Sequence, residues 1–200
     1  MERIGILGGT FDPVHVGHLV AATWCRDALE LDRVLLVVAN EPWQKVTSRT
    51  LSSPEERFSV VNAAVQGIEA LEASRIEIDR GGPSYTADTV QELSKSHPEA
   101  ELCLIVGSDV AAGLGTWQRV EEISDLAILV VVDRSTAELQ VTESSHLHWE
   151  GTVRHVRMPC LEVSSSELRE RIQRGQSVDF LIPDPAIRLI SELGLYSVDR

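Results

Sequence analysis

The segment Gly8–His18, GGTFDPVHVGH, combines a glycine turn with two histidines, and both features suit phosphate binding. Gly8 and Gly9 let backbone N–H groups approach a phosphate without a Cβ in the way. The helix predicted to follow offers N–H groups and the positive end of its dipole. His15 and His18 are three residues apart, so both rings can face one site. A plain tight turn with surface histidines is the alternative. A metal pair is a third interpretation, but no acidic or cysteine ligand is obvious at a useful spacing.

A second candidate anion site lies at the predicted start of a helix near residue 164. Ser164, Ser165 and Ser166 supply hydroxyls beside the N–H groups of a helix start. Arg169 lies about one turn into this helix and can reach the same anion as a bidentate donor. A capping box, S/T-x-x-E, explains Ser164 and Glu167 alone. It does not explain three serines together with the arginine.

Short apolar runs alternate with helical stretches along the whole chain. The pattern predicts strands over 4–7, 34–39, 75–78, 102–106, 126–132 and 153–158, and helices over 17–31, 54–68, 86–94, 164–174 and 184–193. In the first of these helices, Val20, Trp24, Ala28 and Leu31 recur at helical spacing. Residues 133–151 are polar and predict a surface loop. Alternation of this kind is typical of the α/β class, with a doubly wound parallel sheet. We expect one domain over 1–200, with 164–200 as a helical subdomain.

Ligands of such sheets bind at the carboxyl ends of the strands, so residues that follow strands are candidates too. Gly107 and Asp109 follow the predicted strand at 102–106. Trp117 lies in a polar context, although core packing is the usual role of a tryptophan. Tyr85 and Thr86 stand where a helix begins, with Thr86 as the predicted N-cap. Such a helix start attracts a carboxylate, but an ordinary cap explains it equally well.

Composition and charge exclude several classes of protein. The formal charge of −13 argues against binding to nucleic acid or to an anionic membrane surface. No apolar run approaches the length of a membrane span, and no signal peptide is recognised at the N-terminus. Cys25, Cys103 and Cys160 form no C-x-x-C pair, and we expect all three to be reduced and buried, as in a cytoplasmic protein.

The motif GGTFDPxHxGH after the first predicted strand resembles the signature of the nucleotidyltransferases with an H-x-G-H motif. Chain length and the remaining motifs are more similar to nicotinate-nucleotide adenylyltransferases than to the other members, and the resemblance runs from Ile4 to Tyr196. It implies a Rossmann-like nucleotidyltransferase fold. It also implies that ATP is bound by Gly8, Gly9, Thr10, Phe11, His15, His18, Gly107, Asp109, Ser164, Ser165, Ser166 and Arg169.

The same resemblance implies how the acceptor, nicotinate mononucleotide, is bound. Tyr85 and Thr86 would hold its carboxylate through backbone groups, Trp117 would stack on the pyridine ring, and Lys45 would bind phosphate. The family usually has Pro-Pro-His-Lys at Lys45, whereas this chain has Trp43 and Gln44 before the lysine. Ser166 stands where the family has a threonine, and the hydroxyl is kept.

The implied reaction transfers AMP from ATP to nicotinate mononucleotide, giving nicotinate adenine dinucleotide and pyrophosphate, in NAD biosynthesis. His15, His18, Lys45 and Arg169 would be its catalytic residues, Mg²⁺ would arrive with ATP, and we expect no metal site built by the protein. Three rivals stay open: a nicotinamide mononucleotide enzyme, a phosphopantetheine adenylyltransferase, and a non-catalytic nucleotide sensor. A zinc-binding structural protein is a remote fourth. The sequence leaves open whether the chain forms a homo-oligomer.

Overall fold

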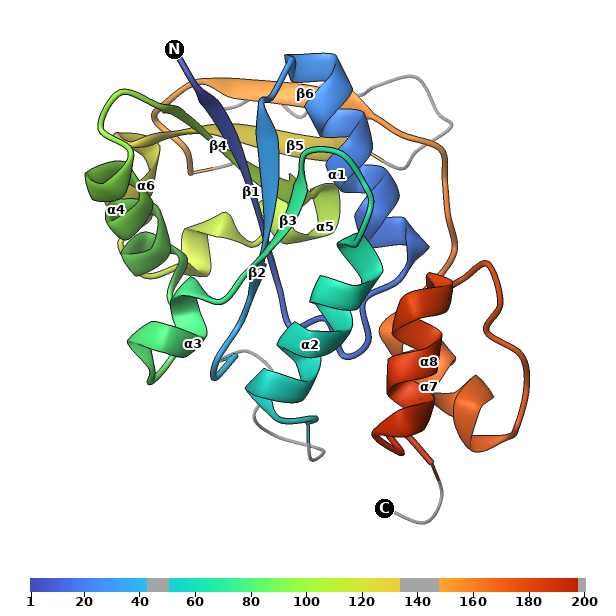
Figure 1. Cartoon of the computed structure of the whole chain (residues 1–200). Coiled ribbons are helices and arrows are strands. Elements are labelled where there is room, and N and C mark those ends of the chain that lie inside the picture. The colour runs from blue at the N-terminus through green and yellow to red at the C-terminus, as the bar shows by residue number, and fades with distance from the viewer. Residues whose placement is uncertain (43–50, 134–147, 198–200) are drawn as a thin grey trace. The chain divides into compact units, whose positions relative to one another are not determined.

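The fold, obtained as a computed structural model, is built on one six-stranded sheet (Figure 1). The structure describes residues 1–42, 51–133 and 148–197. The strands are β1 (Arg3–Gly9), β2 (Arg33–Val38), β3 (Leu71–Ser74), β4 (Glu101–Gly107), β5 (Ala127–Asp133) and β6 (Val153–Arg157). Their order across the sheet is β3-β2-β1-β4-β5-β6. The pairs β1–β4, β4–β5 and β5–β6 are parallel, as the buried apolar runs predict.

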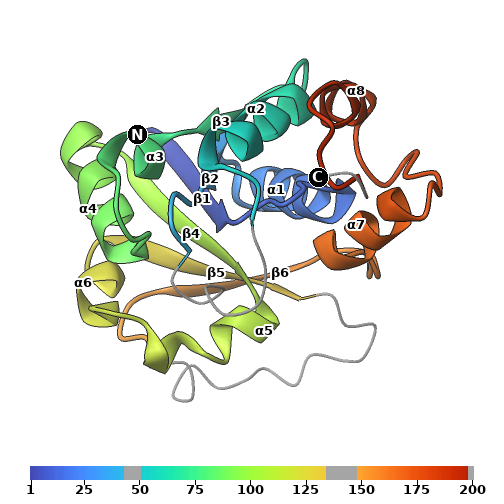
Figure 2. The same cartoon turned by 90° about the horizontal axis from the view of Figure 1, so that it is seen from below.

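Helices occupy most of the connections between these strands. They are α1 (Val16–Leu29), α2 (Pro54–Val65), α3 (Ile76–Arg80), α4 (Thr86–Ser96), α5 (Ser108–Ala111), the short 3₁₀ helix η2 (Leu114–Thr116), α6 (Val120–Ser124), α7 (Ser165–Gln173) and α8 (Asp184–Glu192). Helix α4 packs against α6, and α2 packs against α8 (Figure 2). The predicted α/β class and doubly wound parallel sheet are confirmed. In the part of the chain that the structure describes, no helix is long and apolar enough to cross a membrane.

The strand order places the topological switch point between β1 and β4. From β1 the chain moves to β2 and β3 on one side, and from β4 it moves to β5 and β6 on the other. In open α/β sheets the ligand crevice lies outside the carboxyl ends of the strands at this point. Gly8, in β1, and Gly107, at the end of β4, therefore occupy the expected positions.

The chain divides into two compact units. Unit 1 comprises Met1–Gly8, Ala21–Leu35 and Tyr85–Leu161, and unit 2 comprises Gly9–Val20, Leu36–Ser84 and Glu162–Arg200. In unit 2 the last two helices thus cluster with the glycine–histidine segment and with α2. The predicted single domain with a helical subdomain stays a prediction.

One predicted strand is wrong. Residues 75–78 alternate between polar and apolar side chains, but the strand lies earlier, at Leu71–Ser74, and Ile76–Arg80 is the helix α3. Helical spacing lets Arg75 pair with Asp79 at 2.7 Å. Gly81, with φ 72°, ends the helix by donating its N–H to the carbonyls of Glu77 and Ile78.

The helix predicted over 17–31 is present as α1, but of its apolar residues at helical spacing Leu31 is buried whereas Trp24 is 42% exposed and Ala28 is exposed. The helix instead buries its smaller residues Ala22 and Cys25. Cys25 and Cys103 are buried as predicted, but Cys160 is exposed, since it follows the last strand in a segment without regular structure.

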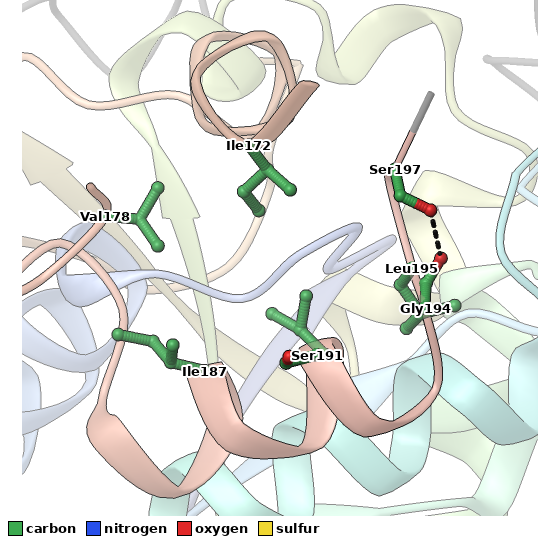
Figure 3. A pocket seen from close by; sticks show the side chains of 8 residues that line it. Ile172, Val178, Ile187, Ser191, Gly194, Leu195 and Ser197 are labelled. Carbon is green, nitrogen blue, oxygen red and sulfur yellow. Dashed lines mark hydrogen bonds between the residues drawn. The ribbon is translucent and has the colours of Figure 1, made fainter. Parts of the chain in front are cut away.

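The helices α7 and α8 form an apolar pocket of about 220 Å³ with the segment that joins them and the chain after α8 (Figure 3). Its walls include Ile172 of α7, Val178 of the joining segment and Ile187 of α8. On the far side, the Ser197 hydroxyl donates to the Gly194 carbonyl at 2.9 Å. The predicted helical C-terminal portion is therefore held together by apolar contacts of its own.

Candidate functional site

The turn after β1 is shaped by one glycine and one aromatic ring. Phe11 is 2% exposed and has a φ of 50°, the left-handed region that non-glycine residues seldom adopt. A Cβ on Gly9 would stand 2.8 Å from the Phe11 ring, so only glycine fits beneath it. The N–H of Ala39, just after β2, donates to the Gly9 carbonyl at 3.0 Å. The glycine motif therefore makes a close-packed turn, and Thr10 lies within it.

His15 and His18 stack on each other at the start of α1. Their ring centroids are 3.7 Å apart, with 29° between the planes. The backbone N–H of His15 donates to Nδ1 of His18 at 3.2 Å, which leaves Nε2 of a neutral His18 as the protonated nitrogen. The edge-to-face contact of His18 with Phe11, at 5.0 Å, orients the ring further. A Cβ on Gly17 would lie 3.1 Å from the His15 ring, so this glycine makes room for the stack.

The start of α7 is bonded to the same turn, although more than 150 residues separate the two segments. Ser165 Oγ donates to the carbonyl of Pro13 at 2.8 Å, and Arg169 donates to the carbonyl of Asp12 at 2.6 Å. Arg169 also donates to Ser166 Oγ at 2.9 Å. Ser164 is the N-cap, as predicted, and accepts the N–H of Glu167 at 3.2 Å. The two predicted anion sites thus belong to one cluster within unit 2.

Two residues that the sequence reasoning did not single out support this cluster. Arg57 of α2 is 1% exposed and donates to the Thr10 carbonyl at 2.9 Å. Tyr196 donates its hydroxyl to the carboxylate of Asp12, itself 2% exposed, at 2.7 Å. Burial lowers the pKa of Arg57, and the charge of Asp12 opposes that shift. A signal for Arg57 existed, because it continues the i, i+3, i+4 spacing of the buried residues Val60 and Val61.

The remaining ATP candidates lie in unit 1, at the carboxyl ends of neighbouring strands. Gly8 belongs to the end of β1, and Gly107 ends β4, which pairs in parallel with β1. The two glycines therefore lie at one edge of the sheet. Asp109 is exposed in α5, directly after Gly107.

An ion pair joins the two segments of unit 1 that carry predicted acceptor-binding residues. Arg119, two residues after Trp117, pairs with Asp88, two residues after Thr86. Thr86 is not the N-cap, contrary to prediction. Tyr85 takes that position because its carbonyl accepts the first helical hydrogen bonds, from the N–H groups of Asp88 and Thr89.

The chain just before Tyr85 is tied to the end of β2 within unit 2. The N–H of Asn40 donates to Ser84 Oγ at 2.8 Å, and the Asn40 side-chain amide donates to the carbonyl of Gly82 at 2.9 Å. The N–H of Ser84 donates to the carbonyl of Glu41 at 3.0 Å. Lys45, with Trp43 and Gln44, lies outside the described residues, as does most of the loop predicted over 133–151.

Among the described residues, no three or more His, Cys, Asp or Glu side chains gather as they would around a metal ion. The candidate site consists of backbone N–H groups, two imidazoles, serine hydroxyls and a guanidinium. These groups are donors of hydrogen bonds and suit an anionic substrate such as a polyphosphate.

Comparisons with known proteins agree with the fold. The family model described as "Cytidylyltransferase-like" matches residues 6–171. A solved structure of Plasmodium falciparum nicotinic acid mononucleotide adenylyltransferase, complexed with NaAD, superposes with a TM-score of 0.77 over 98% of each chain. Its sequence is 18% identical, so this likeness concerns the fold alone. The chain has the Rossmann-like fold of the nucleotidyltransferases.

Curated relatives narrow the class further. A "probable nicotinate-nucleotide adenylyltransferase" of Corynebacterium kroppenstedtii is 40% identical over 194 residues, which cover 97% of this chain and 90% of the relative. A protein of the same name from Clavibacter michiganensis subsp. michiganensis is 41% identical and covers 97% of this chain and 94% of its own length. This chain belongs to the nicotinate-nucleotide adenylyltransferase family.

Proposed function

We propose that this enzyme transfers AMP from ATP to nicotinate mononucleotide, releasing pyrophosphate and forming nicotinate adenine dinucleotide for NAD biosynthesis. The proposal rests on membership of the family and, above all, on one structural observation. The stacked pair His15–His18 and the start of α7 converge on the turn at Asp12 and Pro13. Two helix N-termini beside one glycine turn supply the clustered N–H donors that a triphosphate requires.

The reaction needs no protein nucleophile, because the 5′-phosphate of the acceptor attacks the α-phosphorus of ATP in line. Catalysis then consists of positioning and of stabilising charge on the departing pyrophosphate. We assign the phosphate contacts to His15, His18, Lys45 and Arg169. The Nδ1 of His18 already accepts a backbone N–H, so Nε2 is the nitrogen that donates to phosphate.

The other ATP contacts come from backbone groups and hydroxyls. We assign them to Gly8, Gly9, Thr10, Phe11, Gly107, Asp109, Ser164, Ser165 and Ser166. Ser165 donates its hydroxyl to Pro13, so we expect it to hold the turn and to offer its backbone N–H to the substrate. Mg²⁺ enters as part of the substrate, bound to the triphosphate and to few protein ligands.

The acceptor is held by Tyr85, Thr86, Trp117 and Lys45. Tyr85 and Thr86 stand at the start of α4, an eleven-residue helix whose first N–H groups attract a carboxylate. Nicotinate carries that charge and nicotinamide does not. Trp117 is half-buried and so exposes part of its ring for stacking. We place the reaction in the cytoplasm and treat residues 1–200 as one nucleotidyltransferase domain.

The test is pyrophosphate release from Mg-ATP, with nicotinate and nicotinamide mononucleotides in parallel reactions. We expect rapid release with the acid and little with the amide. Equal release with both would keep the transfer reaction and refute the carboxylate argument. Binding of ATP without release in either reaction would refute the proposed transfer and favour a nucleotide sensor.

A further inference from the structure

All hydrogen bonds of the Arg57 side chain in the described part of the chain go to backbone carbonyls. Its Nε donates to Ser52 at 3.0 Å, and one terminal nitrogen donates to Thr10 at 2.9 Å and to Ala39 at 2.6 Å. The other terminal nitrogen donates to Asn40 at 3.0 Å. A guanidinium offers five N–H donors in a rigid plane. The four hydrogen bonds of Arg57 reach carbonyls of three separate segments.

The position of Arg57 is set by the start of α2. Ser53 and Glu56 form a reciprocal capping box, in which Ser53 Oγ accepts the N–H of Glu56 and the Glu56 carboxylate accepts the N–H of Ser53. The N–H of Arg57 donates to the Ser53 carbonyl at 3.0 Å. The capping box fixes the residue at which α2 begins, and so it fixes the position of Arg57 in the first turn of the helix.

Stability alone is a weak reason for a buried guanidinium at this position. Removing such a charge from water is unfavourable, and apolar side chains of similar volume often stabilise a core at least as well. The neighbours Val60 and Val61 on the same helix are apolar and fully buried. What Arg57 does and an apolar residue cannot do is join the carbonyl of Thr10 to those of Ala39 and Asn40.

The hydrogen bond from Arg57 to Thr10 holds the part of the turn that is under conformational strain. Thr10 precedes Phe11, whose left-handed backbone persists only when its surroundings hold it. Phe11 packs on Gly9 and against the edge of His18. A displaced Thr10 carbonyl would move Phe11, and His18 would lose the ring that orients it.

We propose that Arg57 is a positioning residue for ATP binding, which holds the Gly9–Phe11 turn against the end of β2 so that the turn and His18 meet the phosphates. This inference rests on the proposed function, since it concerns the same ATP site. Arg57 itself touches no substrate. Arg57 bonds the turn directly, through the Thr10 carbonyl, and reaches the chain before Tyr85 only through Asn40, so we expect the larger effect on ATP.

The experiment compares Arg57→Met with Val61→Ala in the full chain. Val61 lies one turn further along α2 and is fully buried, so its truncation destabilises the same helix without touching the turn. For each variant we would measure the melting temperature, the Kd of ATP in the absence of acceptor, and the KM of each substrate. For Arg57→Met we expect the Kd and KM of ATP to rise at least tenfold and the KM of nicotinate mononucleotide to rise several times less. Val61→Ala should lower the melting temperature and leave both KM values within twofold.

Two results would overturn the proposal. One is an ATP Kd for Arg57→Met within twofold of that for Val61→Ala, and the other is an equal rise in both KM values. If Arg57→Met does not fold, Arg57→Lys replaces it, since lysine keeps the charge but cannot span the three segments. Failure of the proposed function would look different, because the unaltered protein would then release no pyrophosphate. The ATP Kd values of the unaltered protein and of both variants could still be compared.

Discussion

The hydroxyl of Tyr196 donates a 2.7 Å hydrogen bond to the carboxylate of Asp12, across 184 positions of the chain. Asp12 is buried, and its carbonyl accepts from Arg169. The chain after α8 is thereby joined to the turn that carries the glycine–histidine motif. Tyr196 accordingly supports the turn of the candidate site, a part that the sequence analysis did not assign to it.

Replacing Tyr196 by phenylalanine should destabilise the fold by about 1–3 kcal/mol, because the buried carboxylate of Asp12 loses one of its hydrogen-bond donors. Urea unfolding followed by circular dichroism measures the change. Ser197→Ala is the matched control, since the hydrogen bond described for its hydroxyl goes to the nearby Gly194 carbonyl at an exposed position. The control should stay within about 0.5 kcal/mol of the unaltered protein. An equal loss in both variants would show that the bond to Asp12 adds no stability.

Buried acidic groups predict a loss of stability at alkaline pH. Burial raises the pKa of the Cys25 thiol from 9.0 to about 12, and burial followed by the charge of Asp12 raises the pKa of Tyr196. The unfolded chain loses these protons at lower pH than the folded chain does. Their contribution is therefore complete below about pH 9 and declines as the pH rises toward the folded values.

The free energy of unfolding, measured from about pH 8 to pH 11, should fall with pH in the unaltered protein. Cys25→Ala should fall less steeply from about pH 9, and Tyr196→Phe should fall less steeply from about pH 10. Identical slopes in all three proteins would contradict the assignment of the alkaline loss to these two groups.

Loss of the His18 ring should abolish most turnover and leave the fold intact. We expect His18→Ala to lower kcat by about 10²–10³-fold, the usual effect of removing one donor to developing charge. His155 is exposed on β6, so His155→Ala serves as the control and should keep normal kcat. Steady-state pyrophosphate release measures both, and near-normal turnover of His18→Ala would remove the histidine from the mechanism.

A methyl group on Gly9 should disturb the turn from within. The added Cβ would lie 2.8 Å from Cζ and 2.9 Å from Cε1 of Phe11, so the ring must shift away from its contact with His18. We expect Gly9→Ala to lose about 1–3 kcal/mol of stability and to bind ATP more weakly. Gly113→Ala is the control, because its nearest neighbour would be the Val110 carbonyl at an ordinary 3.5 Å. Unchanged melting temperature and ATP Kd in Gly9→Ala would refute this account of the turn.

Local sequence patterns were sufficient to predict most helices and strands. They were insufficient where contacts between side chains decide which element forms. The helices predicted over 54–68, 164–174 and 184–193 agree with α2, α7 and α8 to within a few residues at their ends. The strand predicted over 75–78 failed, because an alternating pattern of four residues also fits one helical turn. There the pair Arg75–Asp79 and the left-handed Gly81 favour the helix.

Within the candidate site, the sequence by itself predicted the groups that we propose to bind phosphate, because glycines, histidines at i and i+3 and serines at a helix start act through local geometry. It also determined the α/β class, since buried strands and helices have different periods. Only the tertiary structure decided that Arg57 joins Thr10 to the end of β2 and that Tyr196 bonds Asp12. Those contacts join segments far apart in the chain, and their partners are backbone carbonyls or a single carboxylate. Every residue has a backbone carbonyl, so the sequence does not show which carbonyl accepts the hydrogen bond. The path of the folded chain decides that.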